Sequence, residues 1–248
     1  MLNVNLITKC FSGNKALDGV SFAVNAGELT AVIGPNGAGK TTLLDAISGL
    51  ITIDMGSIVL DNVEISKLYP WTRARSYLGR SFQRPKLVDS LTATENVMLH
   101  FREQVGANLI PATFMRWRWR DEEARVRDRA LELIQALGIS ELADHFVSLL
   151  SYGQKKLVAL AGAMADGVIV ALLDEPLTGI DPDRVKRAAA ALRVIADRGG
   201  HVLVVEHNLT VVASIAERVI VLDRGKVIAD GPPSKVLPSD ALSRAYTR

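Results

Sequence analysis

The sequence contains one cysteine and no long apolar run, and these shortages exclude two classes of protein. Cys10, the only cysteine among 248 residues, cannot form an internal disulfide, which fits a reducing compartment. No apolar run approaches the roughly 18 residues that a membrane-spanning helix requires. The longest are "GVIVALL" (167–173) and "HVLVV" (201–205), which have the length of buried strands. Neither a disulfide-stabilised domain nor an integral membrane protein is therefore expected.

The chain also lacks an excess of charge of either sign. Its 29 Lys and Arg residues against 27 Asp and Glu residues give a formal net charge of +2, so no nucleic-acid partner is expected. Hydrophobic residues make up 48% and charged residues 23%, which is ordinary for a globular protein. The N-terminus, "MLNVNLITKCF", lacks the basic and then apolar pattern of a signal peptide. We expect a soluble intracellular protein that reaches any membrane through a partner.

The first two thirds of the chain change from β to helical character. Residues 1–30 read as strands, and "LTAVIG" (29–34) is a buried strand that leads into a glycine-rich loop and a helix ending at Gly49. Residues 56–65 return to strand character. From about residue 86 to 150 the pattern is helical, and we interpret this region as a helical insertion.

After residue 166, apolar strands alternate with helices. "VIVALLD" (168–174) and "HVLVVEH" (201–207) are buried strands, and the helix between them begins with Asp181 as its cap. A hairpin that turns at Arg224–Gly225 follows. Buried strands alternating with helices predict an α/β fold with a mostly parallel sheet.

A phosphate-binding loop is the strongest functional signal in the sequence. "GPNGAGKT" fits the pattern G-x-x-x-x-G-K-[ST], and it follows a strand and opens a helix, as that pattern requires. Glycines let backbone N–H groups turn towards phosphate oxygens, and the helix start adds a favourable potential. Lys40 would reach the β- and γ-phosphates and the Thr41 hydroxyl would ligate Mg²⁺. The predicted nucleotide-binding residues here are Gly34, Pro35, Asn36, Gly37, Ala38, Gly39, Lys40, Thr41 and Thr42.

Two later strands end on polar side chains that suit the same nucleotide. "VIVALLDEP" ends on Asp174 and Glu175, and "HVLVVEH" ends on His207. The carboxyl edge of a parallel sheet is where such folds bind ligands. Asp174 would hold Mg²⁺ through its water shell, Glu175 would polarise the attacking water, and His207 would lie beside the γ-phosphate. The alternative is that each strand simply leaves the core at a polar loop.

A second anion-binding element is predicted far from the phosphate loop. In "LLSYGQKK" (149–156) a serine, a glycine and the start of a helix follow one another, and these groups together form a small anion site. Ser151 is equally suited to cap the helix, and the two roles are compatible. The chain has no second phosphate loop that would supply the ligand of this element.

These segments together resemble the ATP-binding-cassette (ABC) ATPases over about residues 4 to 236. "GPNGAGKTT" resembles their Walker A sequence, "VIVALLDE" their Walker B sequence and "LSYGQ" their signature, which is commonly LSGGQ. By the same resemblance Gln83 in "SFQRP" is the Q-loop glutamine and "TGID" (178–181) is the D-loop. His207 matches the switch histidine, and Phe11 matches the aromatic residue that stacks on adenine.

The resemblance implies an α/β fold in one ABC ATPase domain over residues 1–248. It would be a P-loop NTPase (RecA-like) core with an N-terminal antiparallel β-subdomain and an inserted α-helical subdomain. The core is expected at about 1–83 and 155–236, the helical subdomain at about 84–154 and a C-terminal tail at 237–248.

The resemblance also implies a dimer in which two cassettes sandwich ATP head to tail. Ser151, Gly153 and Gln154 of one chain, with Asp181, would contact ATP held by the other chain. The catalytic residues would be Glu175, His207, Gln83 and Lys40. The Mg²⁺ ligands would be Thr41, Gln83 and Asp174. Whether the second ABC subunit is an identical copy or a paralogue stays open.

One departure from the family pattern narrows the group. Tyr152 replaces the first glycine of LSGGQ, and "SYGQ" resembles the variant in ATPase subunits that import branched-chain amino acids and related amides or urea. "EHN" (206–208) where EHD is commoner, and Gly167 before a strand, are weaker departures that remove no catalytic group. The long stretch between Gln83 and the signature also resembles this import group.

The implied partners are membrane-embedded permease subunits and, indirectly, a periplasmic solute-binding protein. The expected location is peripheral, at the cytoplasmic face of the inner membrane. An exporter ATPase of the kind that extracts lipopolysaccharide has a similar cassette and is one alternative. A soluble mechanochemical ABC protein is another, although its usual long coiled-coil insertion or second cassette is missing from this sequence.

The chain has a single aromatic and basic cluster, in "MRWRWRDEEARVR" (115–127). Trp117, Trp119 and the neighbouring arginines would suit a permease surface or anionic headgroups. The alternative is an ordinary amphipathic helix with its arginines in water and one tryptophan packed inward.

Overall fold

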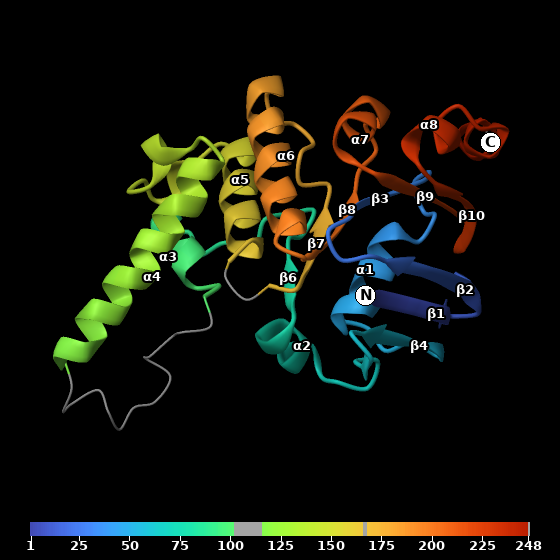
Figure 1. Cartoon of the computed structure of the whole chain (residues 1–248), viewed down its shortest axis with the longest axis horizontal. Helices are drawn as coiled ribbons and strands as arrows, with labels where there is room; N and C mark the ends of the chain where they lie inside the picture. The colour runs from blue at the N-terminus through green and yellow to red at the C-terminus, as the bar shows by residue number, and fades with distance from the viewer. Residues whose placement is uncertain (102–115, 166–167, 248) are drawn as a thin grey trace.

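The computed structural model describes residues 1–101, 116–165 and 168–247, and its centre is a six-stranded sheet with strand order β10-β9-β3-β8-β7-β6 (Figure 1). The five strands from β9 to β6 are parallel, and β10 is antiparallel to β9. The strands are β3 (Leu29–Ile33), β6 (Leu78–Arg80), β7 (Val170–Asp174), β8 (His201–Val205), β9 (Arg218–Asp223) and β10 (Lys226–Gly231). The predicted mostly parallel α/β sheet is confirmed.

A second, antiparallel sheet is built from the N-terminal part of the chain in the order β2-β1-β4-β5. Its strands are β1 (Leu2–Phe11), β2 (Asn14–Val24), β4 (Met55–Leu60) and β5 (Val63–Glu64). The strand predicted over 56–65 is thus a hairpin. It is divided by Asp61 and Asn62, whose φ angles of 44° and 67° are the left-handed values that tight hairpin turns require.

The helices lie on both sides of the central sheet. They are α1 (Lys40–Ser48), α2 (Pro70–Ser76), α3 (Ala93–Met98), α4 (Arg116–Ala136), α5 (Tyr152–Ala163), α6 (Pro182–Asp197), α7 (Leu209–Ile215), α8 (Pro233–Val236) and α9 (Asp240–Tyr246), with short 3₁₀ turns at Ser140–Leu142 and Val147–Leu149. Figure 1 shows α3, α4 and α5 at one end of the molecule and the antiparallel sheet at the other. Among the described residues, no helix is both long and apolar enough to cross a membrane.

The alternation of side chains along β7 separates two hydrophobic cores. Val170 and Leu172 pack with α1 and the antiparallel sheet, whereas Ala171 and Leu173 pack with α5 and the other helices. Successive side chains of a strand point to opposite faces, so α1 and α5 cover opposite faces of the central sheet. The helix that starts at the phosphate loop and the helix that starts at "SYGQ" are therefore kept apart by the sheet.

Helix α4 buries one stripe of apolar side chains. Val126, Ala130, Ile134 and Leu137 are buried at spacings of three and four residues, and Gly138, with a left-handed φ of 66°, follows the helix. The segment "ATENVMLHFRE" (93–103) has a helical pattern, and helix α3 occupies only its first part. It has a Thr92–Glu95 capping box and ends at Met98, and Phe101 beyond its end is buried in the core of the helical part.

Two predictions concern α5 and the start of α4. Helix α5 runs through residues 154 and 155, where the sequence placed the end of the helical subdomain, and it packs against both α3 and β7. The side chains of Trp117 and Trp119 lie outside the described residues, although the backbone there belongs to α4.

A buried arginine holds the C-terminal end of α1. The Arg73 side chain, 3% exposed, donates hydrogen bonds from all three of its nitrogens to backbone carbonyls. The acceptors are Ala46, Ile47, Ser66 and Leu68, at 2.7–3.1 Å. A cation among the last carbonyls of a helix is stabilised by the helix dipole as well as by these bonds.

We expect Arg73→Met to lower the free energy of unfolding by about 3 kcal/mol, because four carbonyls lose a charged donor while the apolar stem is kept. For a chain of this size that corresponds to a fall in Tm of roughly 6–12 °C. Thermal unfolding followed by circular dichroism measures it. Arg75→Met, at an exposed position of the same helix, is the control. Equal small shifts in the two variants would show that Arg73 does not stabilise this end of α1.

Candidate nucleotide site

Four parallel strands end together at one edge of the central sheet. Asp174 at the end of β7 pairs with Val205 of β8, and its N–H donates to the Ser81 hydroxyl beyond β6 at 3.2 Å. The Glu206 N–H donates to the Val32 carbonyl of β3 at 3.3 Å. The loops that follow these strands carry the phosphate loop and the predicted residues Gln83, Asp174, Glu175 and His207. Chain segments as far apart as Val32 and Glu206 therefore meet where parallel α/β sheets bind ligands.

The phosphate loop folds back on itself between β3 and α1. Lys40 Nζ lies inside it and donates to the carbonyls of Gly34 and Pro35 at 2.7 and 2.9 Å. Gly39, the residue before α1, offers no side chain to the first turn of the helix, so the N–H groups there are free of a side-chain cap. Such a helix start binds anions. Burial lowers the Lys40 pKa, and the nearby carboxylates of Glu175 and Asp174 oppose that shift.

Two glycines of the loop are required by close packing. Gly34 and Gly39 have φ angles of 152° and 103°. A Cβ at Gly34 would lie 2.0 Å from the Leu222 carbonyl oxygen, and a Cβ at Gly39 would lie 2.5 Å from the Ala16 oxygen. Backbone atoms of the surrounding strands therefore leave room for glycine alone. The loop can approach a ligand closely because no side chains stand in its way.

Asp174 is a buried carboxylate that suits a hydrated cation. It is 2% exposed, and among the described residues its Oδ1 atom has no hydrogen-bond partner. Burial raises the Asp174 pKa, while a hydrogen bond from Thr41 and the charge of Arg80 lower it. No group of three or more His, Cys, Asp or Glu side chains among the described residues forms a complete metal site. Mg²⁺ usually keeps several waters and takes one or two protein oxygens beside phosphates, so Asp174 and Thr41 fit that ion.

Glu175 and His207 face each other beside this carboxylate. His207 Nδ1 lies 3.8 Å from Glu175 Oε2 and 3.4 Å from the Thr178 hydroxyl. Glu175 has a φ of 48°, a left-handed value that is uncommon outside glycine. Its side chain is 20% exposed and that of His207 is 52% exposed, so both can reach a ligand. Strained, partly open polar residues of this kind are typical of functional sites.

Sequence reasoning missed two buried charges behind these residues. Glu206 is 1% exposed, and it accepts hydrogen bonds from the Leu177 N–H at 2.8 Å and the Thr178 hydroxyl at 3.2 Å. Burial raises its pKa, and these two bonds oppose the rise. Lys156 is also buried, and it donates to the carbonyls of Glu175 and Thr178 at 2.8 and 2.9 Å. Burial lowers its pKa, against the raising effect of Glu206, Glu175 and Asp174.

The start of α5 is a rigid turn on the opposite face of the sheet from α1. Ser151 caps α5 by accepting from the Gln154 N–H, while the Gln154 side chain accepts from the Ser151 N–H, which forms a capping box. A Cβ at Gly153 would lie 3.1 Å from the Gly179 carbonyl oxygen. No hydrogen bond of the described residues joins this turn to the phosphate loop. The predicted residues Ser151, Gly153 and Gln154 are thus together, but separate from Lys40 of the same chain.

The remaining predicted residues lie at the margins of the site. Asp181 caps α6, with its Oδ1 accepting from the Arg184 N–H at 3.0 Å. Phe11 is 46% exposed, at the end of the β1–β2 hairpin, whose residue Ala16 packs against Gly39. Gln83 is exposed, and its backbone carbonyl accepts a hydrogen bond from the Tyr152 hydroxyl. The Tyr152 bond is another contact that the sequence pattern does not signal.

The C-terminal helix also reaches the phosphate loop. The Gly34 N–H donates to the Tyr246 hydroxyl of α9 at 3.2 Å, across 212 positions of sequence. Burial raises the Tyr246 pKa, and the bond to Gly34 opposes that rise. The end of the chain is therefore part of the support of the loop.

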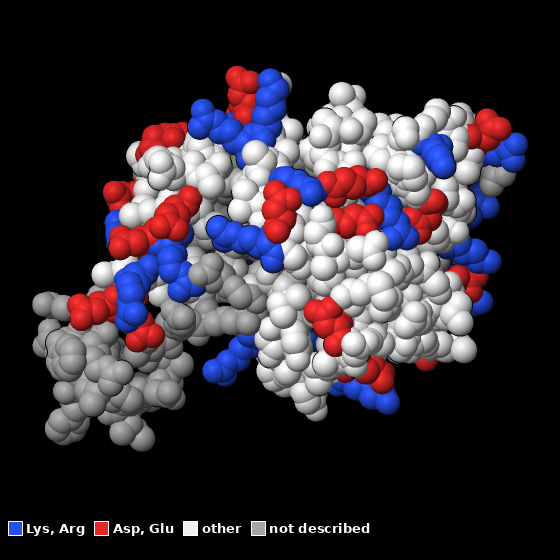
Figure 2. All heavy atoms as spheres, in the orientation of Figure 1, with Lys and Arg blue, Asp and Glu red and all other residues white. Residues whose placement is uncertain are grey.

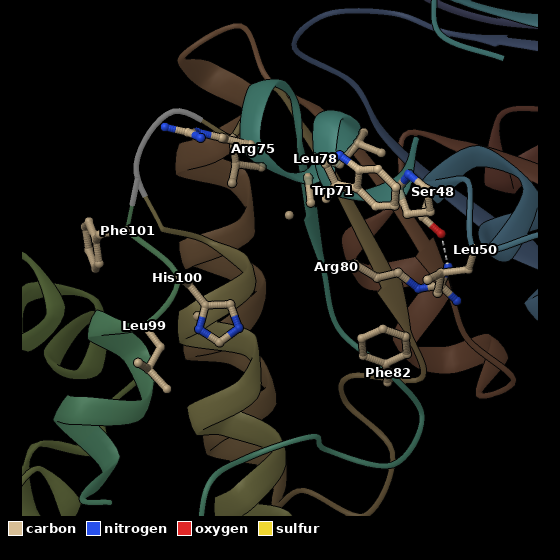
Figure 3. A pocket seen from close by; sticks show the side chains of 15 residues that line it. Ser48, Leu50, Trp71, Arg75, Leu78, Arg80, Phe82, Leu99, His100 and Phe101 are labelled. Carbon is tan, nitrogen blue, oxygen red and sulfur yellow. Dashed lines mark hydrogen bonds between the residues drawn. The ribbon is translucent and has the colours of Figure 1, made fainter. Parts of the chain in front are cut away.

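A groove of about 650 Å³ opens between α2 and the segment that follows α3 (Figure 3). Its lining is largely apolar, and Trp71 and Leu99 contribute side chains that are 66% and 48% exposed. His100 and Arg75 are among its polar residues, and none of the described residues that line it is acidic. On the viewed face, Lys and Arg side chains lie interspersed with Asp and Glu, and residues of other types cover much of the lower right (Figure 2). The groove is thus an apolar recess with a basic rim.

A phosphate loop and acidic strand ends on a parallel sheet, flanked by an antiparallel sheet and a helical part, define a P-loop NTPase with the ABC cassette fold. The family model described as "ABC transporter" matches residues 17–178, and the chain belongs to that family. It is an ABC-type ATPase that binds ATP, and it is a subunit of a transporter. Cassettes of this family dimerise and work with transmembrane permease subunits.

Similar proteins span nearly the whole chain. The lipopolysaccharide export system ATP-binding protein LptB of Haemophilus influenzae is 32% identical over 99% of this chain and 96% of its own length. The high-affinity branched-chain amino acid transport ATP-binding protein BraF of Pseudomonas aeruginosa is 30% identical over 99% and 97%. The dimeric post-hydrolysis structure of the cassette MJ0796, bound to ADP and Pi, has a TM-score of 0.80 at 27% identity, covering 94% of this chain and 99% of that one.

Proposed function

We propose that this subunit hydrolyses ATP to drive import of branched-chain amino acids or related amides. The observation that carries the proposal is Tyr152 in "LSYGQ", the signature variant that resembles the import group, together with the similarity to BraF. A second candidate, export of a lipid such as lipopolysaccharide, is supported by the similarity to LptB. Both candidates use the same hydrolytic site.

The proposed chemistry is attack of water on the γ-phosphorus of ATP. Lys40 and the backbone N–H groups of the phosphate loop would hold the phosphates, and Thr41, Asp174 and Gln83 would hold Mg²⁺. Bound Mg²⁺ supplies charge neutralisation at the phosphate oxygens. Glu175 accepts a proton from the attacking water as the bond to the β–γ bridging oxygen breaks, and ADP and phosphate leave.

His207 and the residues behind Glu175 position this reaction. His207, 3.8 Å from Glu175, would place its other ring nitrogen on the γ-phosphate. Glu206 holds the Leu177–Thr178 segment beside His207, and Lys156 holds the Glu175 carbonyl. The side chains that touch substrate are thus fixed by buried hydrogen bonds rather than left on a free loop.

Each reaction centre would be completed by a second cassette. In one chain the sheet separates the start of α5 from the phosphate loop, so Ser151, Gly153 and Gln154 have no phosphate of their own to bind. In a head-to-tail pair they would meet the γ-phosphate on the partner's loop, with Asp181 at the same interface. Phe11 would stack on the adenine at the edge of the hairpin.

The groove between α2 and the end of α3 is the proposed docking site for the permease. It is apolar and open, it lies beside Phe82 and Gln83, and so it suits a short helix from the membrane subunit. Binding there would place the chain at the cytoplasmic face of the inner membrane, where a periplasmic solute-binding protein would deliver the solute to the opposite side.

Proteoliposomes test the proposed direction and solute. The chain is reconstituted with the permease subunits that the neighbouring genes encode, and Mg-ATP is enclosed in the lumen on the side that carries this subunit. The solute-binding protein and radiolabelled leucine are added outside, and uptake of leucine is measured. We expect ATP-dependent accumulation of leucine in the lumen. In Trp71→Glu, which places a charge in the apolar groove, leucine uptake should fall by more than about tenfold. ATP turnover of the isolated variant should be unchanged. Neighbouring genes for lipid-extracting subunits, and no uptake, would instead support export.

A further inference from the structure

A tyrosine next to the capping serine of α5 touches the loop that carries Gln83. The Tyr152 hydroxyl donates to the Gln83 carbonyl at 2.7 Å, across 69 positions of sequence. Tyr152 is the first residue of α5, and Ser151 before it is held in the capping box with Gln154. The hydroxyl is therefore presented from a fixed helix end, and it reaches the loop through a rigid ring.

One turn further along α5, a buried lysine touches the loop that carries Glu175. Lys156 donates to the carbonyls of Glu175 and Thr178, and its Nζ lies 5.4 Å from the centre of the Tyr152 ring. Residues at i and i+4 share one face of a helix. The same face of α5 thus contacts both loops whose side chains are assigned to hydrolysis.

The arrangement needs the side chain at position 152. A glycine, the residue common in the family signature at this position, has neither the ring that lies near Lys156 nor the hydroxyl that reaches Gln83. Close packing of Gly153 on the Gly179 carbonyl keeps the helix end against the loop that follows Glu175. Three contacts, from Tyr152, Gly153 and Lys156, therefore join the start of α5 to the two loops.

We propose that Tyr152 is a positioning residue that couples the two nucleotide sites of the dimer. ATP held by the partner subunit contacts Ser151 and changes the position of the first turn of α5. Tyr152 transmits this change to the Gln83 loop, and Lys156 transmits it to the Glu175 loop. Each chain then adjusts its own hydrolytic residues to the occupancy of its partner's site. The coupling rests on the proposed function, because it requires Ser151 to contact ATP held by the partner.

The test compares the full-length chain with Tyr152→Phe, which removes only the hydroxyl, and with Tyr152→Gly, which restores the common signature. Steady-state ATP turnover is measured against ATP concentration. We expect kcat to fall about three- to tenfold in both variants, as loss of one well-formed hydrogen bond predicts, with little change in the affinity of the monomer for a fluorescent ATP analogue. The Hill coefficient should fall from above about 1.5 to about 1.

A second readout reports on the contact itself. Hydrogen exchange of the segment 81–90, followed by mass spectrometry without nucleotide, should become at least about threefold faster in Tyr152→Phe, because the loop loses its tie to α5. Tyr69→Phe, at an exposed tyrosine away from the site, is the control and should change neither measurement. The Tm of each variant is also measured. A Tm equal to that of the wild type shows that the fold is retained and that the changes in activity come from positioning.

The outcomes distinguish this inference from the proposed function. An unchanged Hill coefficient, kcat and exchange rate in Tyr152→Phe overturn the role of Tyr152 even if the wild type hydrolyses ATP. Faster exchange with unchanged cooperativity keeps the contact and overturns the coupling. A wild-type chain that neither hydrolyses ATP nor dimerises overturns the proposed function and the coupling with it, whatever the exchange shows.

Discussion

Glu175→Gln is expected to lower ATP turnover by at least about a hundredfold, because the amide cannot accept the proton of the attacking water. ATP binding should survive, since Lys40 and the backbone of the phosphate loop do not depend on that carboxylate. The substitution also removes one negative charge beside the phosphates. Dimers that form around ATP should then persist, because the step that opens them is blocked.

Two measurements on the same protein check this result. Phosphate release gives turnover, and light scattering coupled to size exclusion gives the mass with and without Mg-ATP. Glu132→Gln, at an exposed position of α4, is the control that removes an equal charge far from the site. Turnover that stays near the wild-type value would remove Glu175 from the role of base. A variant that stays monomeric with Mg-ATP would contradict the sandwich dimer.

Local signals were sufficient to predict the elements around the site. A buried strand, the run "GPNGAGKT" and a helix ending at Gly49 could be read directly, because strand pattern, glycine conformation and helix stop depend on neighbouring residues. The Asp181 cap of α6 and the Arg224–Gly225 turn followed for the same reason, and both are confirmed. Parallel order then placed Asp174, Glu175 and His207 at one edge.

Contacts between distant segments could not be predicted in this way. Lys156 lies in a run of polar residues that looks like an exposed helix start, yet packing of α5 on the sheet buries it under the Glu175 loop. Glu206 looks like one more polar residue at a strand end, and Arg73 like a solvated helix residue. Each is buried by tertiary structure, and each then satisfies backbone groups that the sequence does not reveal.

The half-site arrangement leads to the last prediction, which uses two defective chains. Lys40→Ala removes the charge that holds the phosphates. Ser151→Asp keeps a good helix cap for α5 but places a carboxylate where the partner's γ-phosphate would lie. Each variant alone should lose at least about a hundredfold in turnover, since every dimer contains only defective sites.

Mixing the two inactive proteins should restore activity. In a mixed dimer the Lys40 of one chain faces the Ser151 of the other, so one of the two centres is intact. Half of the dimers in an equal mixture are mixed, and turnover should therefore recover to at most about a quarter of the wild-type value. Thr92→Asp, which alters the cap of α3 in the helical part, is the control and should keep full activity. A mixture no more active than the sum of its parts would mean that each chain completes its own centre, because only a site shared between two chains can be repaired by exchanging partners.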